Sequence, residues 1–170
     1  MKVKVSFKKP GGGASAKFKR IIEQAKDSYV LVGVTESAGK YQEQGGPSVA
    51  EVATWNEFGT ETIPERSFIR GSTHSSRPLI KAWQKEALDN LLSKEGYGLR
   101  RALASIGMKL RMLIIRRIKS NIPPPNAPST LAEKKRLNQG NKTLIASRLL
   151  IRSIAYQVSI ASNKDTPKGD

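Results

Sequence analysis

The sequence contains no cysteine and only one histidine, His74. Disulfide bonds and thiolate chemistry are therefore excluded, and a single histidine cannot supply the three or four ligands that a zinc site needs. A serine or threonine nucleophile would have to use His74 as its base, but that residue lies among small polar residues in a predicted loop. We therefore expect no enzyme, and no catalytic, metal-binding or cofactor-binding residues.

Long hydrophobic runs are also missing. No stretch approaches the roughly 18 consecutive apolar residues that a transmembrane helix requires. The start, MKVKVSFKKPGGG, has too short an apolar segment for a signal peptide. We expect a soluble protein that is made in the cytoplasm and has no membrane partner.

Acidic residues are scarce, since 14 Asp and Glu face 30 Lys and Arg, which gives a net charge of +16 over 170 residues. The imbalance is concentrated in the second half, where Glu133 is the only acid between residues 99 and 152. Such a field attracts nucleic acid or an acidic protein surface. Aromatic residues that could stack on bases are few there, and no nucleic-acid-binding motif appears. We therefore favour either a solvated basic face or a basic face that meets an acidic protein partner.

Two further clusters deserve a chemical interpretation. The stretch PGGGASAK at 10–17 has glycines like a phosphate-binding loop, but it lacks the Gly-Lys-Ser/Thr ending, and we predict a flexible turn. Glu57, Glu61 and Glu65 could act as paired carboxylates, but no second group of acids complements them. Salt bridges to Arg66 and Arg70 are the better interpretation.

Hydrophobic periodicity predicts an α+β fold. Alternation predicts strands with one wet face, whereas the continuous apolar run YVLVGV predicts a strand covered on both faces. The predicted strands cover 2–7, 29–34 and 153–160. The predicted helices cover 15–26, 48–58, a segment from about 77, 99–121, and a short basic segment from 130 to 136. We expect a small mixed or antiparallel sheet packed by helices.

The domain organisation follows from the same pattern. One domain is expected over residues 1–162, with a long helical element over 75–121 and a flexible tail over 163–170. Ser48 with Glu51, and Thr130 with Glu133, have the spacing of capping boxes.

Loops are predicted from turn residues. Gly59 is a plausible left-handed helix stop, and we expect a turn at 60–63 and a short extended segment at 67–69. The stretch IPPPNAP at 122–128 should be an extended polyproline-like chain.

The helix predicted at 99–121 has two apolar stripes. Leu99, Leu103, Ile106, Leu110 and Leu113 form one stripe, and Met108, Met112 and Ile115 form a second stripe on roughly the opposite side. A helix of this kind packs on its own subunit with one face and is suited to a neighbouring subunit with the other. The basic residues between the stripes are Arg100 and Arg111 on one side, and Lys109 and Arg116 on the other.

Two stretches resemble a known family. VAEVATWNEFGTETIPERSFIR resembles a segment of the neck and tail-completion proteins of tailed bacteriophages, in which Asn-Glu-Phe-Gly is followed by Ile-Pro-x-Arg-x-Phe-hydrophobic-Arg. NAPSTLAEKKRLNQGNKTLIASRLLIRSIAYQV is similar to the closing segment of the same family. The order and spacing of the two stretches agree with the family. This chain departs from it at residues 143–148, TLIASR, and at Ser67, where the family often has proline.

The resemblance implies a structural virion protein, located in the neck or upper tail after assembly in the host cytoplasm. It implies a ring, expected to be a hexamer, that completes the tail and contacts a head-tail connector or stopper protein and a tail terminator or tail-tube protein. A head-to-tail ring needs two different faces on each subunit. The residues expected to form a structural corner or subunit interface are Trp55, Glu57, Phe58, Gly59, Ile63, Pro64, Arg66, Phe68 and Arg70.

Within this interpretation, the basic charge could face the passing genomic DNA or dock an acidic ring. The rival interpretation is a basic nucleic-acid-binding protein without catalytic activity.

Overall fold

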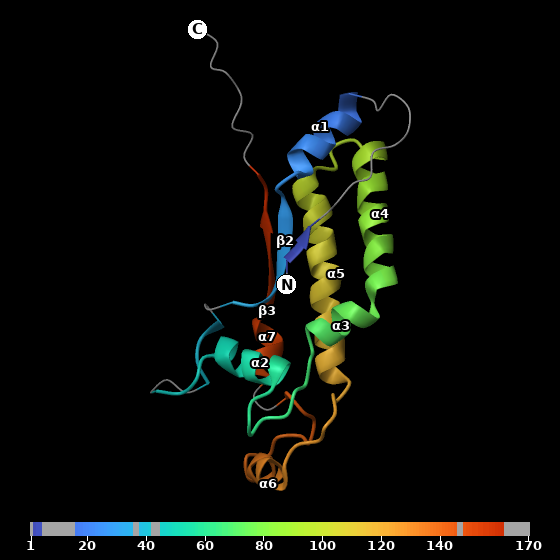
Figure 1. The fold of residues 1–170 in the computed structure, drawn as a ribbon. Helices are drawn as coiled ribbons and strands as arrows, with labels where there is room; N and C mark the ends of the chain where they lie inside the picture. The colour runs from blue at the N-terminus through green and yellow to red at the C-terminus, as the bar shows by residue number, and fades with distance from the viewer. Residues whose placement is uncertain (1, 5–15, 36–37, 42–44, 146–147, 162–170) are drawn as a thin grey trace. The chain divides into compact units, whose positions relative to one another are not determined.

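The computed structural model of the protein describes residues 2–4, 16–35, 38–41, 45–145 and 148–161, and it confirms the predicted α+β fold (Figure 1). The elements in chain order are β1 (Lys2–Lys4), α1 (Ala16–Ala25), β2 (Tyr29–Val34), α2 (Val49–Phe58), α3 (Arg70–Ser75), α4 (Arg77–Ser93), α5 (Leu99–Lys119), α6 (Pro128–Arg136), α7 (Leu149–Ser153) and β3 (Ile154–Ser159). Residues 5–7 of the first predicted strand, most of the stretch at 10–17 and the predicted tail lie outside the described residues.

The strands form a sheet in the order β1–β2–β3. β1 and β2 are antiparallel, with Val3 opposite Val30. The expectation that residues 29–34 are covered on both faces is wrong. Val30 and Val32 are buried on one face, whereas Leu31 between them is 37% exposed. A continuous apolar run permits burial on both sides of a strand, but the number of packing elements decides whether it occurs.

The chain divides into two compact units. The first contains Met1–Leu31, Pro78–Met108 and Tyr156–Asp170, and the second contains Val32–Arg77 and Lys109–Ala155. The first unit therefore holds α1, almost all of α4 and the first half of α5. The second unit holds α2, α3, α6, α7 and the last eleven residues of α5.

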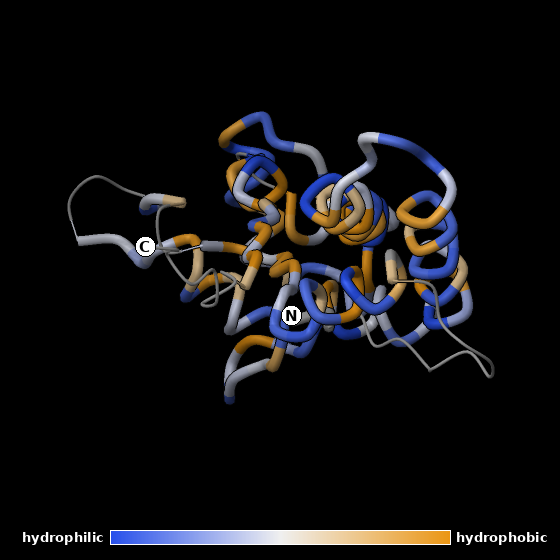
Figure 2. Tube along the Cα trace, turned by 90° about the horizontal axis from the view of Figure 1, so that it is seen from above, coloured by the Kyte–Doolittle hydropathy of each residue, from blue (hydrophilic) through white to orange (hydrophobic). Residues whose placement is uncertain are grey.

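Hydrophobic and hydrophilic residues are interspersed along the helices (Figure 2). In α1, Phe18, Ile21 and Ala25 are buried, as their helical spacing predicts. α4 ends before Gly96 and Gly98, and α5 begins at Leu99.

Gly107 lets α5 approach the sheet within the first unit. A Cβ at this position would lie 2.8 Å from the Val30 Cγ2 atom of β2 and 2.8 Å from the Tyr156 Cδ2 atom of β3. Because those distances are shorter than van der Waals contact, only glycine allows this separation between the helix backbone and the two strands.

α5 runs close to its predicted range and carries the longest buried stripe. Its buried residues are Ala102, Leu103, Ile106, Leu110, Ile114, Ile115 and Ile118. Ile114 and Ile118 extend the first predicted stripe to the end of the helix, because positions four residues apart lie on one helix face. The two-sided character of the helix is described with the site below.

Three loop predictions need correction. The segment GSTHSS is not a loop, because residues 70–75 form α3 and place the exposed His74 in its last turn. Residues 68–69 form a bend rather than an extended segment. Both differences arise from hydrogen bonds to Glu57, which are described below.

The third correction concerns residues 122–136. The chain bends at residues 123–124, so 122–128 is not an uninterrupted polyproline helix. α6 begins at Pro128 with Ala127 as N-cap, and Thr130 does not cap it. Proline is favoured in the first turn, where its missing N–H costs no helical hydrogen bond. Glu133 instead pairs with Arg136, one turn later, at 2.6 Å.

Candidate functional site

The carboxylate of Glu57 organises the stretch from Trp55 to Arg70. The side chain is buried, and its oxygens accept hydrogen bonds from the backbone N–H groups of Phe68, Ile69 and Arg70, each at 2.8 Å. It also accepts hydrogen bonds from the Ser67 hydroxyl at 2.9 Å and from the Arg70 Nε at 3.2 Å. A buried carboxylate with this many donors forms strong charge-assisted hydrogen bonds and holds the start of α3 in place.

α2 delivers Glu57 to this position. The predicted capping box is confirmed, since the Glu51 N–H donates to the Ser48 hydroxyl and the Ser48 N–H donates to the Glu51 carboxylate. Glu57 lies in the last turn of the helix, before Gly59. The Ser48 backbone N–H and hydroxyl both donate to the Glu51 carboxylate, and these two bonds lower the pKa of Glu51 below its ordinary value.

Gly59 ends α2 with a positive φ, as predicted, but not in the left-handed helical conformation. Its φ of 76° and ψ of 168° belong to a region that is almost restricted to glycine. A Cβ there would lie 3.1 Å from the Glu65 backbone N and 3.3 Å from the Ile63 carbonyl oxygen. The predicted turn follows, closed by a 2.8 Å hydrogen bond from the Thr60 N–H to Ile63.

Arg70 braces the outer side of this turn. Its guanidinium donates to the Glu57 carbonyl at 2.7 Å and to the Glu65 carboxylate at 2.9 Å, and its Cζ lies 4.4 Å from the centre of the Phe58 ring. The predicted salt bridges from Glu57 and Glu65 to Arg70 are therefore confirmed. The side chain is half-exposed, so the outer pair contributes only a little stability.

Arg66 does not make the predicted carboxylate pair. It is buried, its Nε donates to the Pro124 carbonyl at 2.9 Å, and its Nη2 donates to the Pro125 carbonyl at 3.0 Å. Burial lowers its pKa below the ordinary value. Arg66 thus binds the corner to a proline-rich segment almost sixty residues later in the chain, and this cross-link has no local sequence signal.

The apolar residues of the stretch do not form the expected packed corner. Phe68 is completely buried, but Trp55 is 37% exposed and Phe58 is 59% exposed. Ile63 is half-buried and Pro64 is exposed. The corner is therefore held from inside by Glu57, Arg66 and Phe68, and it presents two aromatic side chains to the outside. We call residues 55–70 the Glu57 corner.

Lys134 is a functional candidate that sequence reasoning missed. It is buried, and its ammonium donates to the carbonyls of Gly140, Lys142 and Ile145 at 3.3, 2.5 and 2.6 Å. Burial and the repulsion of the nearby Arg66 charge lower its pKa. In the sequence Lys134 belongs to the basic run EKKR, where a solvated side chain is the natural expectation.

The four basic residues predicted between the two stripes of α5 differ in their exposure. Arg100 and Arg116 are exposed. Arg111 is half-buried, and its Nε donates to the Ile154 carbonyl at 2.7 Å, so it connects α5 to the start of β3. Lys109 is also half-buried.

The second predicted stripe of α5 is divided. Met108 is 55% exposed and Met112 is 53% exposed, whereas Ile115 is buried. Two exposed methionines one helical turn apart leave an apolar strip on the side of α5 away from its buried stripe.

The described residues contain no group of three or more His, Cys, Asp or Glu side chains arranged to hold a metal ion. Within that same part of the chain, no helix has the length and apolar character needed to cross a membrane. No protein-family model, curated protein or solved structure matches this chain. Its function is therefore inferred from its own residues and geometry.

Proposed function

We propose that the protein is a structural virion subunit of a tailed phage, which forms a ring at the neck, completes the tail and joins it to the head connector. The observation that carries the proposal is the Glu57 corner. The residues through which the sequence resembles the phage family include Glu57, Arg66 and Phe68, and these three are buried and hold the corner together. The motif therefore has a physical purpose in this chain, which is to build a fixed loop.

The polar groups of the corner support assembly rather than chemistry. The Glu57 carboxylate and the Arg66 guanidinium bind backbone groups of their own chain. What the corner offers outward is Trp55 and Phe58, with Phe58 supported by the Arg70 guanidinium. Aromatic side chains and arginine held on a rigid base are typical of the energetically dominant residues in protein interfaces.

A head-to-tail ring also requires a second, different surface on each subunit. The strip formed by Met108 and Met112 on α5 is the candidate for it. Methionine side chains are flexible and polarisable, so they adapt to an apolar partner surface.

The proposal is tested by deleting the gene from the phage that encodes the protein and examining the particles. We expect filled heads and tails that fail to join, and virion assembly restored by the gene in trans. Complete, infectious particles formed without the gene would overturn the proposal.

The net charge of +16 supports a second candidate function, which is nucleic-acid binding without catalysis. Analytical ultracentrifugation and DNA titration of the purified chain separate the two. Tight, salt-sensitive DNA binding by a protein that forms no ring in solution or in particles would favour the second function.

A further inference from the structure

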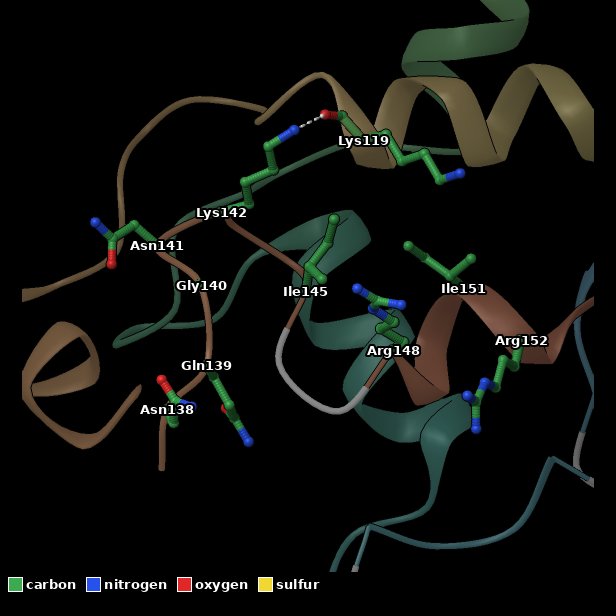
Figure 3. A pocket seen from close by; sticks show the side chains of 10 residues that line it. All are labelled: Lys119, Asn138, Gln139, Gly140, Asn141, Lys142, Ile145, Arg148, Ile151 and Arg152. Atoms are coloured by element: carbon green, nitrogen blue, oxygen red, sulfur yellow. Dashed lines mark hydrogen bonds between the residues drawn. The ribbon is translucent and has the colours of Figure 1, made fainter. Parts of the chain in front are cut away.

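The second unit contains a hollow with a cavity volume of about 860 Å³, which is large enough for a short peptide or a drug-sized ligand (Figure 3). Its lining comes from the end of α5, from residues 138–145 and from α7. The lining residues are Lys119, Asn138, Gln139, Gly140, Asn141, Lys142, Ile145, Arg148, Ile151 and Arg152. We call this site the basic hollow.

The lining carries four positive charges and no carboxylate. Lys119, Lys142, Arg148 and Arg152 are all exposed, so their charges are available at the rim. Arg148 is the N-cap of α7, and Arg152 lies one turn later in the same helix. Cations gathered in a concave site focus the field and attract a ligand that carries several negative charges.

The wall of the hollow is held in position by bonds within the chain. Lys134 binds three carbonyls between residues 140 and 145, including that of Ile145, which lines the hollow. The Asn126 amide donates to the Asn141 carbonyl at 3.0 Å, and the Lys142 ammonium donates to the Lys119 carbonyl at 3.3 Å. A site whose wall is already ordered loses little entropy when a ligand binds.

The rest of the lining is suited to a peptide. Ile145 and Ile151 supply half-buried apolar surface, and the side chains of Asn138, Gln139 and Asn141 carry both donors and acceptors for a peptide backbone. No aromatic residue is among the ten that line the hollow, so bases have no ring to stack on.

We propose that the basic hollow binds an acidic peptide segment of a partner protein. Carboxylates of the segment pair with the rim cations, and an apolar side chain packs on Ile145 and Ile151. Single-stranded nucleic acid fits less well, because it gains from stacking and leaves the two isoleucines uncovered. The inference holds whether or not the chain forms a ring, because an isolated peptide tests it.

The test is a fluorescence anisotropy titration of the full chain with a labelled peptide of Asp and Glu residues around one central leucine. We expect binding that weakens as salt rises, because exposed charges are screened. We expect Arg148→Gln with Arg152→Gln to weaken binding about fivefold to tenfold, as two lost exposed ion pairs predict.

The matched control removes the same charge elsewhere. Lys19→Gln with Lys81→Gln changes two exposed lysines that do not line the hollow, and it should leave the affinity within about twofold. A peptide with serine in place of leucine should bind more weakly than the leucine peptide. Thermal unfolding of both double variants reports whether the fold is retained.

Three results would overturn the inference. The first is no peptide binding at low salt. The second is equal weakening by the hollow variants and the control variants, which would show a general effect of net charge. The third is an oligothymidylate of equal charge that binds more tightly than the peptide and displaces it, which would make the hollow a nucleic-acid site.

Discussion

At the scale of single residues, the Glu57 corner depends on a buried charge. Glu57 is 4% exposed, and its carboxylate accepts hydrogen bonds from three consecutive backbone N–H groups. Sequence reasoning identified the residue and its ion pair with Arg70, but not its bonds to the backbone. The N–H groups that donate to Glu57 lie eleven to thirteen residues later in the chain, so their spacing has no helical or strand periodicity. These hydrogen bonds form only because the chain reverses direction between residues 59 and 67.

Glu57→Gln should lower the free energy of unfolding by about 3 kcal/mol, because a buried charged acceptor is replaced by a neutral group with only one acceptor oxygen. Chemical denaturation measures the change. Glu61→Gln, an exposed position in the same loop, is the control and should change stability by less than about 0.5 kcal/mol. If both substitutions changed the free energy of unfolding equally, the claim that Glu57 stabilises the corner would be contradicted.

Two phenylalanines of the corner should lose very different amounts of stability when each is replaced by alanine. Phe68→Ala removes a fully buried ring and should destabilise the fold by about 3–5 kcal/mol. Phe58→Ala removes a ring that is 59% exposed and should cost less than about 1 kcal/mol.

The pair also separates folding from assembly. If the proposed ring uses the outer side of the corner, Phe58→Ala should reduce the oligomer in sedimentation velocity while the melting temperature changes little. An unchanged oligomer would remove Phe58 from the interface, and a large loss of stability would contradict its exposed position.

At the scale of elements, the start of α2 depends on the capping box of Ser48 and Glu51. The pKa of Glu51 is lowered from its ordinary 4.5 by hydrogen bonds with Ser48, so the ionised form is favoured in the folded chain. Its stabilising contribution is therefore present above the unfolded pKa and is lost as pH falls through the lower, folded pKa.

The measurement compares wild type with Glu51→Gln at about pH 7 and about pH 3. We expect the wild type to have a larger free energy of unfolding than Glu51→Gln at about pH 7. We expect this difference to shrink at about pH 3. Ser48→Ala should destabilise the chain by about 1 kcal/mol. It should reduce that pH-dependent difference only in part, because the backbone N–H of residue 48 still donates to the Glu51 carboxylate. If the stability difference between wild type and Glu51→Gln grew as the pH fell, the stabilising role of the ionised Glu51 carboxylate would be contradicted.

The packing of α5 on β2 and β3 in the first unit depends on Gly107. Gly107→Ala would gain about 1 kcal/mol in helix propensity, but its Cβ would lie 2.8 Å from Val30 and Tyr156. Overpacking of this kind costs about 1–3 kcal/mol. We therefore expect Gly107→Ala either to lower the free energy of unfolding or to leave it unchanged. A melting temperature above that of the wild type would show that the strands move away without cost.

For the molecule as a whole, the excess basic residues have two different roles, because some bind backbone carbonyls of the chain and others are exposed. Arg66 and Lys134 are buried and bind backbone carbonyls, and Arg111 connects α5 to β3. The basic hollow gathers four exposed cations. A net charge read from the sequence cannot distinguish a structural cation from one that is available to a partner.

If the chain forms the proposed ring, the ring should depend on the exposed methionines of α5. Met112→Glu places a charge at a position that is 53% exposed, so the monomer should remain folded while the oligomer is lost, because a buried charge in the interface would be costly. Leu79→Glu, at a position on α4 that is 45% exposed, is the control. Sedimentation velocity reads out both variants, and a ring that survives Met112→Glu would exclude this strip from the interface.

Sequence patterns predicted the α+β class, the span and buried stripe of α5, the capped α2 with its glycine stop, and the concentration of positive charge after residue 99. These features follow from periodicity, capping and composition, which depend on residues a few positions apart. Three further features appear only in the folded chain: Arg66 binds carbonyls of a proline segment, Lys134 is buried, and four cations line one hollow. Those contacts join residues that are far apart in the chain or that have no fixed spacing. They form because folding brings the residues together and buries them, so no local sequence pattern predicts them.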